Sequence, residues 1–188
     1  MKIGLLGTGA YGMALADIMS YNNHDIVMWT KFKDEKEMLE KERGNEKLLP
    51  GYKLPKEITI TNKIEECIED KDLLVIAIPA AFIDDVARLM AKHINRNAHI
   101  LIATKGIEQG TGLFIHQIIR KHIHTRNVAA ISGPSFAVDI ITRMPVGLAV
   151  AAISGIVAVG VSAAKSVEEF DKSLKDLSSL TGMVGADL

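Results

Sequence analysis

The first seventeen residues constrain the fold of this chain more than any other segment. A short apolar run, Ile3 to Leu6, is followed by a glycine-rich turn and then by a run of helix-forming residues. A strand, a G-x-G-x-x-G turn and a helix in that order are the context of a dinucleotide-binding loop. The sequence therefore predicts a nucleotide-binding loop here, in preference to a turn with a structural role alone. Its residues are Gly7, Thr8, Gly9, Ala10, Tyr11 and Gly12.

Each glycine of this loop has an expected role. Gly7 permits the tight turn, Gly9 lets the backbone approach a pyrophosphate, and Gly12 lets the helix pack closely on the strand. The helix N-terminus adds unpaired N–H groups and the positive end of its dipole. Together these features predict that the loop binds the phosphates of a dinucleotide.

The pattern after this loop alternates between strands and helices. Strands are expected at 3–6, 25–29, 58–61, 73–78, 100–103, 128–131 and 147–152, and helices at 11–20, 33–43, 64–69, 80–92, 113–122 and 136–142. Such alternation predicts an α/β fold of the Rossmann type, with a doubly wound, mostly parallel sheet and helices on both faces. This dinucleotide-binding domain is expected to span residues 1–150.

Local patterns add expectations about single side chains. Asn62 is expected to cap the helix 64–69, with Glu65 completing a capping box. The helical periodicity predicts one buried face on each of the next two helices. The core candidates on these faces are Phe82, Val86, Leu89, Met90, Phe114, Ile118 and Ile119.

Composition narrows the classes of partner. The net charge is −1, which gives no reason to expect a nucleic-acid partner. Cys67 is the only cysteine, so this chain cannot form an internal disulfide, and a cytoplasmic location is expected. The chain begins with a strand pattern rather than a signal peptide. Its six histidines show no metal-ligand spacing, so no metal site is expected.

One uncharged stretch, residues 146–164, is long enough on length alone to span a membrane. Three glycines and two serines interrupt it. A buried strand followed by a glycine-broken buried segment is therefore preferred to a membrane helix.

Ligands of such sheets bind outside the carboxyl ends of the strands, so the site residues are expected in the loops there. After the strand 25–29, the usual acidic residue that holds a ribose 2′-hydroxyl is missing, and Lys31 and Lys33 follow instead. A basic pair suits a 2′-phosphate, which favours NADP over NAD; the alternative is that both are ordinary surface lysines. Phe32 either packs on the adenine or covers the end of the sheet.

Three later loops also contain candidate site residues. Phe82 is either a wall on the nicotinamide side or a core anchor. Lys105 follows the strand 100–103, where a lysine can hold a phosphate or polarise a carbonyl oxygen. After the strand 128–131, Gly133 permits close backbone approach, and Ser135 is expected to cap the next helix at a second anion site.

Three of these loops together resemble NAD(P)-dependent sn-glycerol-3-phosphate dehydrogenase. They are GTGAYGMALA, ATKGIE, and ISGPSFAVD followed by MPVGLAVA. The resemblance covers residues 1–150 almost continuously. It implies reversible hydride transfer between NAD or NADP and dihydroxyacetone phosphate, which gives sn-glycerol 3-phosphate for phospholipid synthesis. The expected partners are this small-molecule substrate and a second copy of the chain in a homodimer.

The resemblance also implies roles for single residues. Lys105 is expected to act in positioning and electrostatic stabilisation, in contact with both cofactor and substrate. The implied cofactor contacts are residues 7–12, Lys31, Phe32, Phe82, Lys105 and Ala137, and the implied substrate contacts are Lys105, Gly133, Ser135 and Asp187.

Beyond Ala149 the sequence departs from the family pattern. The family continues into a helical second domain whose G-x-x-K-N stretch supplies a proton-donating lysine, and no such stretch is found here; Lys165 has different neighbours. The final TGMVGADL resembles a later signature that contributes an aspartate, here Asp187. Residues 151–188 are therefore expected to be a fragment of the helical substrate domain of a longer enzyme. The 188 residues are expected to bind cofactor with little or no turnover.

Two other functions stay open at this point. Another β-hydroxyacid-type dehydrogenase, or a ketopantoate-type reductase, would share the first loop but lack TKGIE combined with SGPSFA. A non-catalytic NAD-binding regulatory module would account for the missing lysine.

Overall fold

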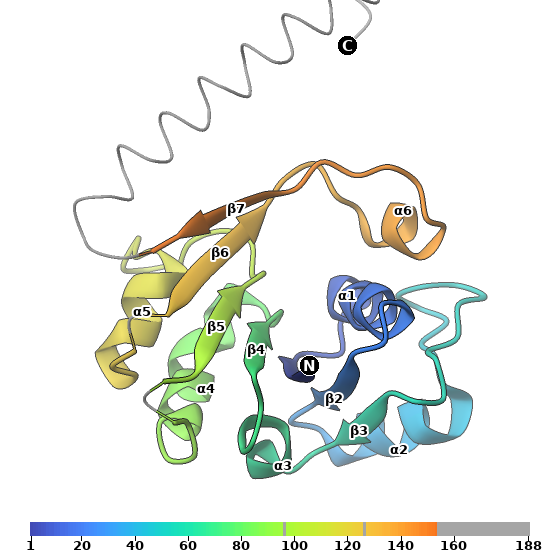
Figure 1. The fold of residues 1–188 in the computed structure, drawn as a ribbon, viewed down its shortest axis with the longest axis horizontal. Helices are drawn as coiled ribbons and strands as arrows, with labels where there is room; N and C mark the ends of the chain where they lie inside the picture. Colours follow the sequence, from blue (N-terminus) through green and yellow to red (C-terminus); the bar gives the residue numbers. More distant parts are fainter. Residues whose placement is uncertain (96, 126, 154–188) are drawn as a thin grey trace, which may run out of the picture. The chain divides into compact units, whose positions relative to one another are not determined.

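Strands and helices alternate along the chain in the computed structural model, which describes residues 1–95, 97–125 and 127–153 (Figure 1). The strands are β1 (Lys2–Leu6), β2 (Asp25–Trp29), β3 (Thr59–Thr61), β4 (Leu73–Ile76), β5 (His99–Ile102), β6 (Val128–Ser132) and β7 (Ala149–Ala152). The helices are α1 (Ala10–Tyr21), α2 (Lys33–Glu42), α3 (Ile64–Ile68), α4 (Ile83–Met90), α5 (Ile115–His122) and α6 (Ala137–Ile141), with a 3₁₀ turn η1 (Ala80–Phe82).

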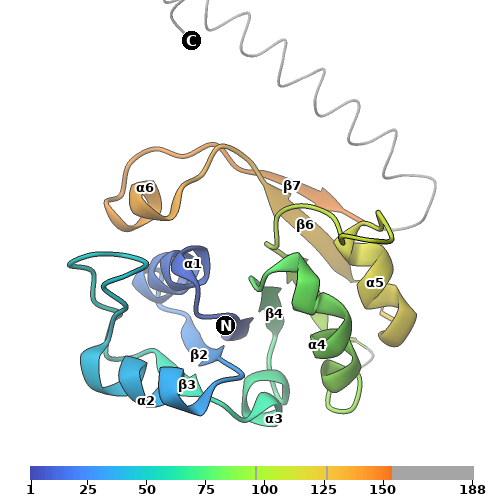
Figure 2. The ribbon, with the colours of Figure 1, turned by 180° about the vertical axis from the view of Figure 1, so that it is seen from behind.

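The described strands form one sheet in the order β3-β2-β1-β4-β5-β6-β7. All neighbouring pairs are parallel except β6 and β7, which are antiparallel. Helices α1 and α6 pack together on one face, and α3, α4 and α5 follow one another over the other face (Figures 1 and 2). The expected doubly wound, mostly parallel α/β fold is confirmed. The strand order reverses between β1 and β4, which is where ligands of such sheets bind.

The first strand shows how the sequence allows helices on both faces. Ile3 and Leu5 are buried in the cluster that faces α1. Gly4 lies on the opposite face, where a Cβ atom would come within 1.9 Å of the Cys67 carbonyl oxygen in α3. Only a glycine at this position lets α3 pack this closely on the sheet.

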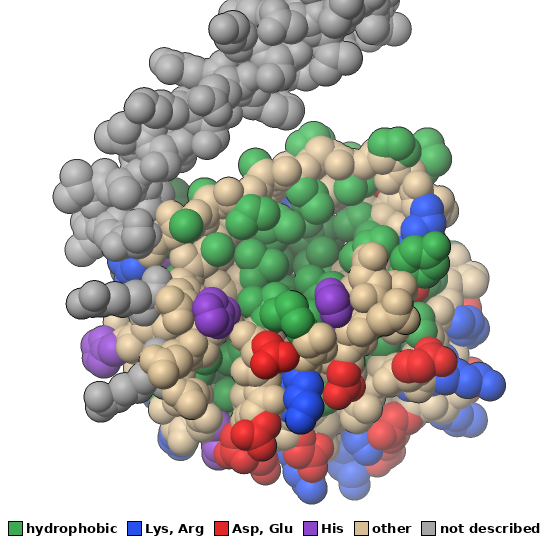
Figure 3. Space-filling view, viewed as in Figure 1, with side chains coloured by type: hydrophobic (Ala, Val, Ile, Leu, Met, Phe, Trp, Pro, Cys, Tyr) green, Lys and Arg blue, Asp and Glu red, His purple; other side chains and the backbone are tan. Residues whose placement is uncertain are grey.

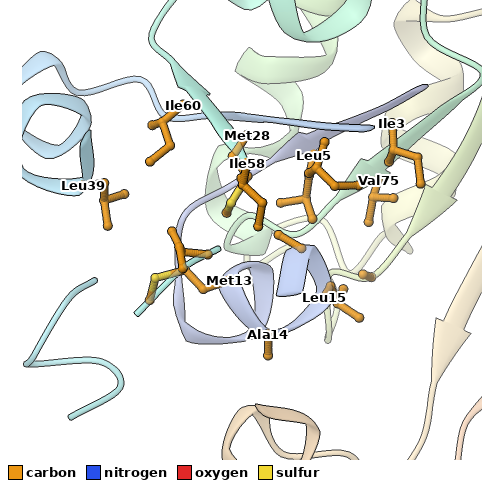
Figure 4. Close-up of a cluster of buried hydrophobic side chains, with 14 of the residues drawn as sticks. Ile3, Leu5, Met13, Ala14, Leu15, Met28, Leu39, Ile58, Ile60 and Val75 are labelled. Carbon is orange, nitrogen blue, oxygen red and sulfur yellow. The ribbon is translucent and has the colours of Figure 1, made fainter. Parts of the chain in front are cut away.

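A buried apolar cluster joins the sheet to α1 (Figure 4). Leu5 from β1, Met28 from β2 and Val75 from β4 pack there with Met13 from the first turns of α1. Burying each large apolar side chain is worth about 1.5–3 kcal/mol. This packing fixes the N-terminal end of α1 relative to the carboxyl ends of the central strands.

The expected cap of α3 is wrong. Lys63, not Asn62, is the N-cap residue, and no side chain caps this helix. Thr61 makes the side-chain hydrogen bonds at the start of the helix instead. Its Oγ1 accepts a hydrogen bond from the Lys63 N–H and donates one to Glu66 at 2.6 Å. The strand ends at Thr61 and the helix begins at Ile64, as expected, so only the capping interaction differs from the prediction.

The predicted buried face of the helix 80–92 is partly wrong. Val86 and Met90 are buried, but Phe82 and Leu89 are exposed, and Ile83 and Ala87 take their places. Phe82 belongs to η1, a tighter turn that follows Pro79, so the 3.6-residue period does not set its direction.

Two other apolar expectations also need correction. Phe114 is exposed because it is the extended N-cap residue of α5, whereas Ile118 and Ile119 are buried as predicted. Strand β7 forms within the expected range 147–152, but all its residues are exposed rather than buried, since it pairs with β6 alone among the described strands. The rest of the uncharged stretch, 154–164, lies outside the described residues. No helix in the described ranges is long and apolar enough to cross a bilayer.

Candidate cofactor-binding cleft

A cleft of about 620 Å³ lies at the carboxyl ends of the central strands. On the face drawn in Figure 3, hydrophobic side chains gather around a hollow. Nearly all the sequence-predicted site residues line the cleft. They are residues 7–12, Lys31, Phe32, Phe82, Lys105, Ser135 and Ala137.

Two glycines of the first loop are required by the chain's own packing. Gly7 has a φ of 119°, and a Cβ there would lie 2.3 Å from the Ala77 carbonyl oxygen. A Cβ on Gly12 would lie 2.5 Å from the Gly7 carbonyl oxygen. The turn after β1 and the close approach of α1 to it therefore both depend on glycine.

Gly9 differs from these two, because nothing in the described chain requires a glycine there. Its φ is −67°, and no atom lies within 4 Å of the position of a Cβ. It is the N-cap of α1, whose first turn contains no acidic residue. An open space beside unpaired N–H groups at a helix N-terminus fits a pyrophosphate. The residues present therefore fit a dinucleotide.

Lys105 joins three loops of the cleft. The loop after β5 is tied to the loop after β4, because Thr104 Oγ1 donates a hydrogen bond to the Ile78 carbonyl oxygen at 2.8 Å. The Lys105 ammonium lies 4.7 Å from the centre of the Tyr11 ring and donates a hydrogen bond to the Ser135 carbonyl oxygen at 3.1 Å. Among the described residues, no carboxylate pairs with this ammonium within 4 Å. Its charge is therefore available to an anionic ligand.

Ser135 contributes to the cleft differently from the way the sequence suggested. Its side chain is 2% exposed, and its Oγ lies 3.1 Å from the Tyr11 hydroxyl. It does not cap α6: the N-cap residue is Phe136, and no side chain caps this helix of five residues. The expectation that Ser135 caps this helix is therefore wrong. Ser135 instead holds Tyr11 against the loop after β6.

The remaining substrate-side predictions lie elsewhere. Gly133 does not line the cleft; a Cβ there would lie 2.2 Å from the Gly147 carbonyl oxygen. This glycine permits a close approach of the chain's own segment before β7. Asp187 lies outside the described residues.

The two predicted aromatic contacts lie at the cleft with more than half of each side chain exposed. Phe32 is 58% exposed and Phe82 is 53% exposed. Phe82 is therefore part of the cleft wall, and the alternative that it is a core anchor is wrong.

Sequence reasoning missed one charged residue of the cleft. Glu35, in the first turn of α2, lines it and accepts a hydrogen bond from the Thr30 hydroxyl. The loop directly after β2 contains no acidic residue, and Glu35 lies one helical turn later. Its position twenty-three residues after Gly12 could have identified it, since the ribose-binding acid of such domains lies about 20 residues after the glycine loop.

Comparison with known proteins agrees with this geometry. Residues 2–155 match the family described as "NAD-dependent glycerol-3-phosphate dehydrogenase N-terminus". A glycerol-3-phosphate dehydrogenase [NAD(P)+] from Teredinibacter turnerae is 34% identical over 151 residues, which cover 80% of this chain and 44% of the relative. The corresponding protein of Agathobacter rectalis is 35% identical over 144 residues, with 77% and 43% covered.

A solved structure gives the same result. The crystal structure of glycerol-3-phosphate dehydrogenase from Coxiella burnetii superposes with a TM-score of 0.73 at 26% identity, covering 79% of this chain and 46% of that one. The chain thus spans less than half the length of the relatives that it matches. These relatives favour neither the regulatory module nor another hydroxyacid-type dehydrogenase. The chain belongs to the family of NAD-dependent glycerol-3-phosphate dehydrogenases, whose N-terminal region it matches.

Proposed function

We propose that this chain is the cofactor-binding part of an enzyme that transfers hydride between NAD(P)H and dihydroxyacetone phosphate, giving sn-glycerol 3-phosphate. The names of its relatives support this reaction. The observation that supports it best is the position of Lys105, whose unpaired ammonium lies where the loops after β1, β5 and β6 meet. A cation there can hold an anionic substrate beside a bound dinucleotide.

The residues of the cleft then have distinct tasks. The glycine loop and the N-terminus of α1 bind the pyrophosphate. When bound, the nicotinamide cofactor supplies the hydride for the ketone carbon. Lys105 stabilises negative charge that develops on the ketone oxygen, and Tyr11 and Ser135 hold its ammonium in place. Ala137, Gly133 and Asp187 keep the cofactor and substrate roles that the family resemblance implies.

The proposal also covers the substrate, the cellular location and the oligomeric state of the enzyme. A small phosphate-bearing ketone as partner agrees with the cation that Lys105 contributes to the cleft. A cytoplasmic location agrees with a single cysteine that is buried and reduced. A homodimer stays a prediction from the resemblance, which sedimentation analysis would check.

Replacing Lys105 by Ala tests the proposal. Trp29 is the only tryptophan of the chain and lines the cleft, so its emission reports dinucleotide binding directly. Lys105→Ala should leave the fold intact but abolish binding of dihydroxyacetone phosphate to the cofactor-loaded chain. In a polypeptide that turns over, kcat/KM should fall at least about 100-fold, as for loss of one preorganised electrostatic group.

Lys41→Ala is the matched control, because this lysine is 83% exposed on α2 and does not line the cleft. It should bind both ligands like the wild type. A Lys105→Ala variant with undiminished substrate binding and kcat/KM would contradict the assigned role.

A further inference from the structure

The adenosine end of the cleft contains a carboxylate that belongs to a helix rather than to the loop after β2. Thr30, Lys31 and Phe32 follow the end of β2, and all three line the cleft. Glu35 joins them from the first turn of α2. In Rossmann-type domains an acidic residue about 20 positions after the glycine loop binds the ribose 2′-hydroxyl. Glu35 has this spacing.

Thr30 holds this carboxylate in place. Its side chain is 3% exposed, and its backbone N–H donates a hydrogen bond to the Thr61 carbonyl oxygen at 3.0 Å. Its Oγ1 accepts a hydrogen bond from the Phe32 N–H at 3.3 Å and donates one to Glu35 Oε2. Because Thr30 is fixed by the sheet, Glu35 is fixed through it. The second oxygen, Glu35 Oε1, has no hydrogen-bond partner in the part of the chain that the structure describes, so it can accept one from a ligand.

The charge at this end of the cleft disfavours an added phosphate. Within the described residues, no lysine, arginine or histidine nitrogen lies within 4 Å of the Glu35 carboxylate. The first turn of α2 also contains Asp34, so the positive end of this helix already faces two carboxylates. A ribose 2′-hydroxyl could donate a hydrogen bond to Glu35, whereas a 2′-phosphate would be repelled by it.

Lys31 is the competing group at the same end. It lines the cleft but is exposed, and no described residue holds its ammonium in place. A solvated lysine on a flexible stem interacts weakly with an anion compared with a fixed, oriented group. We propose that Glu35, positioned by Thr30, binds the ribose 2′-hydroxyl and makes this chain selective for NAD(H) over NADP(H). The proposal rests on the proposed function, and it reverses the preference that Lys31 and Lys33 suggested in the sequence.

Titration of NADH and NADPH into the full chain, followed by Trp29 emission, tests this selectivity. The wild type should bind NADH about tenfold or more tightly than NADPH. Glu35→Gln removes the charge but keeps a group that can bond to Thr30. It should bind NADPH more tightly, so that the two affinities differ by less than about threefold. Thr30→Val, which releases Glu35, should also reduce the ratio.

Controls separate this effect from general changes in charge or fold. Glu37→Gln lies on the same helix outside the cleft and should keep the wild-type ratio. Thermal unfolding of each variant shows whether it is folded. Lys31→Ala should change NADPH affinity by less than about twofold. A tenfold loss there would assign the site to a 2′-phosphate and overturn the inference.

Two other results would also overturn it. A wild-type preference for NADPH, or an unchanged ratio in Glu35→Gln, would overturn the selectivity while leaving the proposed function intact. Failure of the wild type to bind either dinucleotide would overturn the selectivity and the proposed function together.

Discussion

The three glycines of the first loop cannot be told apart from the sequence pattern, but each is required for a different physical reason. Gly7 is needed because its backbone lies at positive φ against the Ala77 carbonyl, and Gly12 because α1 touches the turn. Gly9 has open space where a side chain would be. Folding therefore accounts for two of the glycines, and the proposed dinucleotide accounts for the third.

Alanine at these positions should separate stability from binding. Gly7→Ala should lower the free energy of unfolding by about 2 kcal/mol or more, since the turn cannot move away from the new methyl group. Gly9→Ala should cost less than about 1 kcal/mol, which urea unfolding would measure. Its NADH affinity should nevertheless fall at least about tenfold, because the methyl group occupies the phosphate space. Wild-type affinity in Gly9→Ala would refute the placement of the pyrophosphate.

At the scale of elements, one ion pair joins α1 to the end of α6. Asp17 is buried on α1, and its Oδ2 lies 2.5 Å from Arg143 Nη1. Arg143 has a φ of 60°, at a helix end where glycine is usual. Its guanidinium also lies 4.7 Å from the centre of the Tyr21 ring. These contacts offset the backbone strain and keep the segment that contains Ser135 against the glycine loop.

Removing one partner of this ion pair should lower the free energy of unfolding by more than the pair itself contributes, because the other partner is left unpaired. Arg143→Ala leaves a buried carboxylate unpaired and should lower the free energy of unfolding by about 1–3 kcal/mol. The double variant with Asp17→Ala should lose less than the sum of the single variants. Arg88→Ala, which breaks an exposed pair with Asp84, should cost less than about 1 kcal/mol. Strict additivity in the double-variant cycle would show that the pair contributes no coupling.

At the scale of the whole molecule, the single thiol reports on the packing of helix against sheet. Cys67 on α3 is fully buried, and its Sγ donates a hydrogen bond to the Val27 carbonyl oxygen at 3.4 Å. Burial raises the pKa of this thiol to about 12. Because the thiolate is the reactive form, Cys67 should react only when α3 separates from the sheet.

A bound cofactor should slow the labelling of Cys67 because it stabilises the native state. A disulfide reagent should modify the native chain slowly and the urea-unfolded chain fast. NADH at about 100 times its Kd stabilises the native state by about 2.7 kcal/mol, which should slow labelling about 100-fold. In the Gly9→Ala variant the same NADH concentration should protect far less. Equal labelling rates in native and unfolded chains would contradict the buried position of the thiol.

The sequence predicted the strands well because buried parallel strands are short, apolar and bounded by turn residues. It failed where a side chain's direction depends on more than periodicity. Phe82 is exposed because it belongs to a 3₁₀ turn, and Phe114 because it is an extended N-cap residue. At the start of α3, Thr61 rather than Asn62 makes the side-chain hydrogen bonds. Helices α4 and α5 begin three and two residues after the expected starts at 80 and 113, and local patterns resolve such shifts poorly.

By itself, the sequence determined the order of the elements, the glycine loop and the loops expected to face it, because each of these is a local pattern. Only the tertiary structure showed that Glu35 enters the cleft, that Lys105 lies between Tyr11 and Ser135, and that Gly9 borders empty space. The physical reason is that these relations join segments far apart in the chain. They depend on which strand ends are neighbours in the sheet and on how each helix is rotated against it.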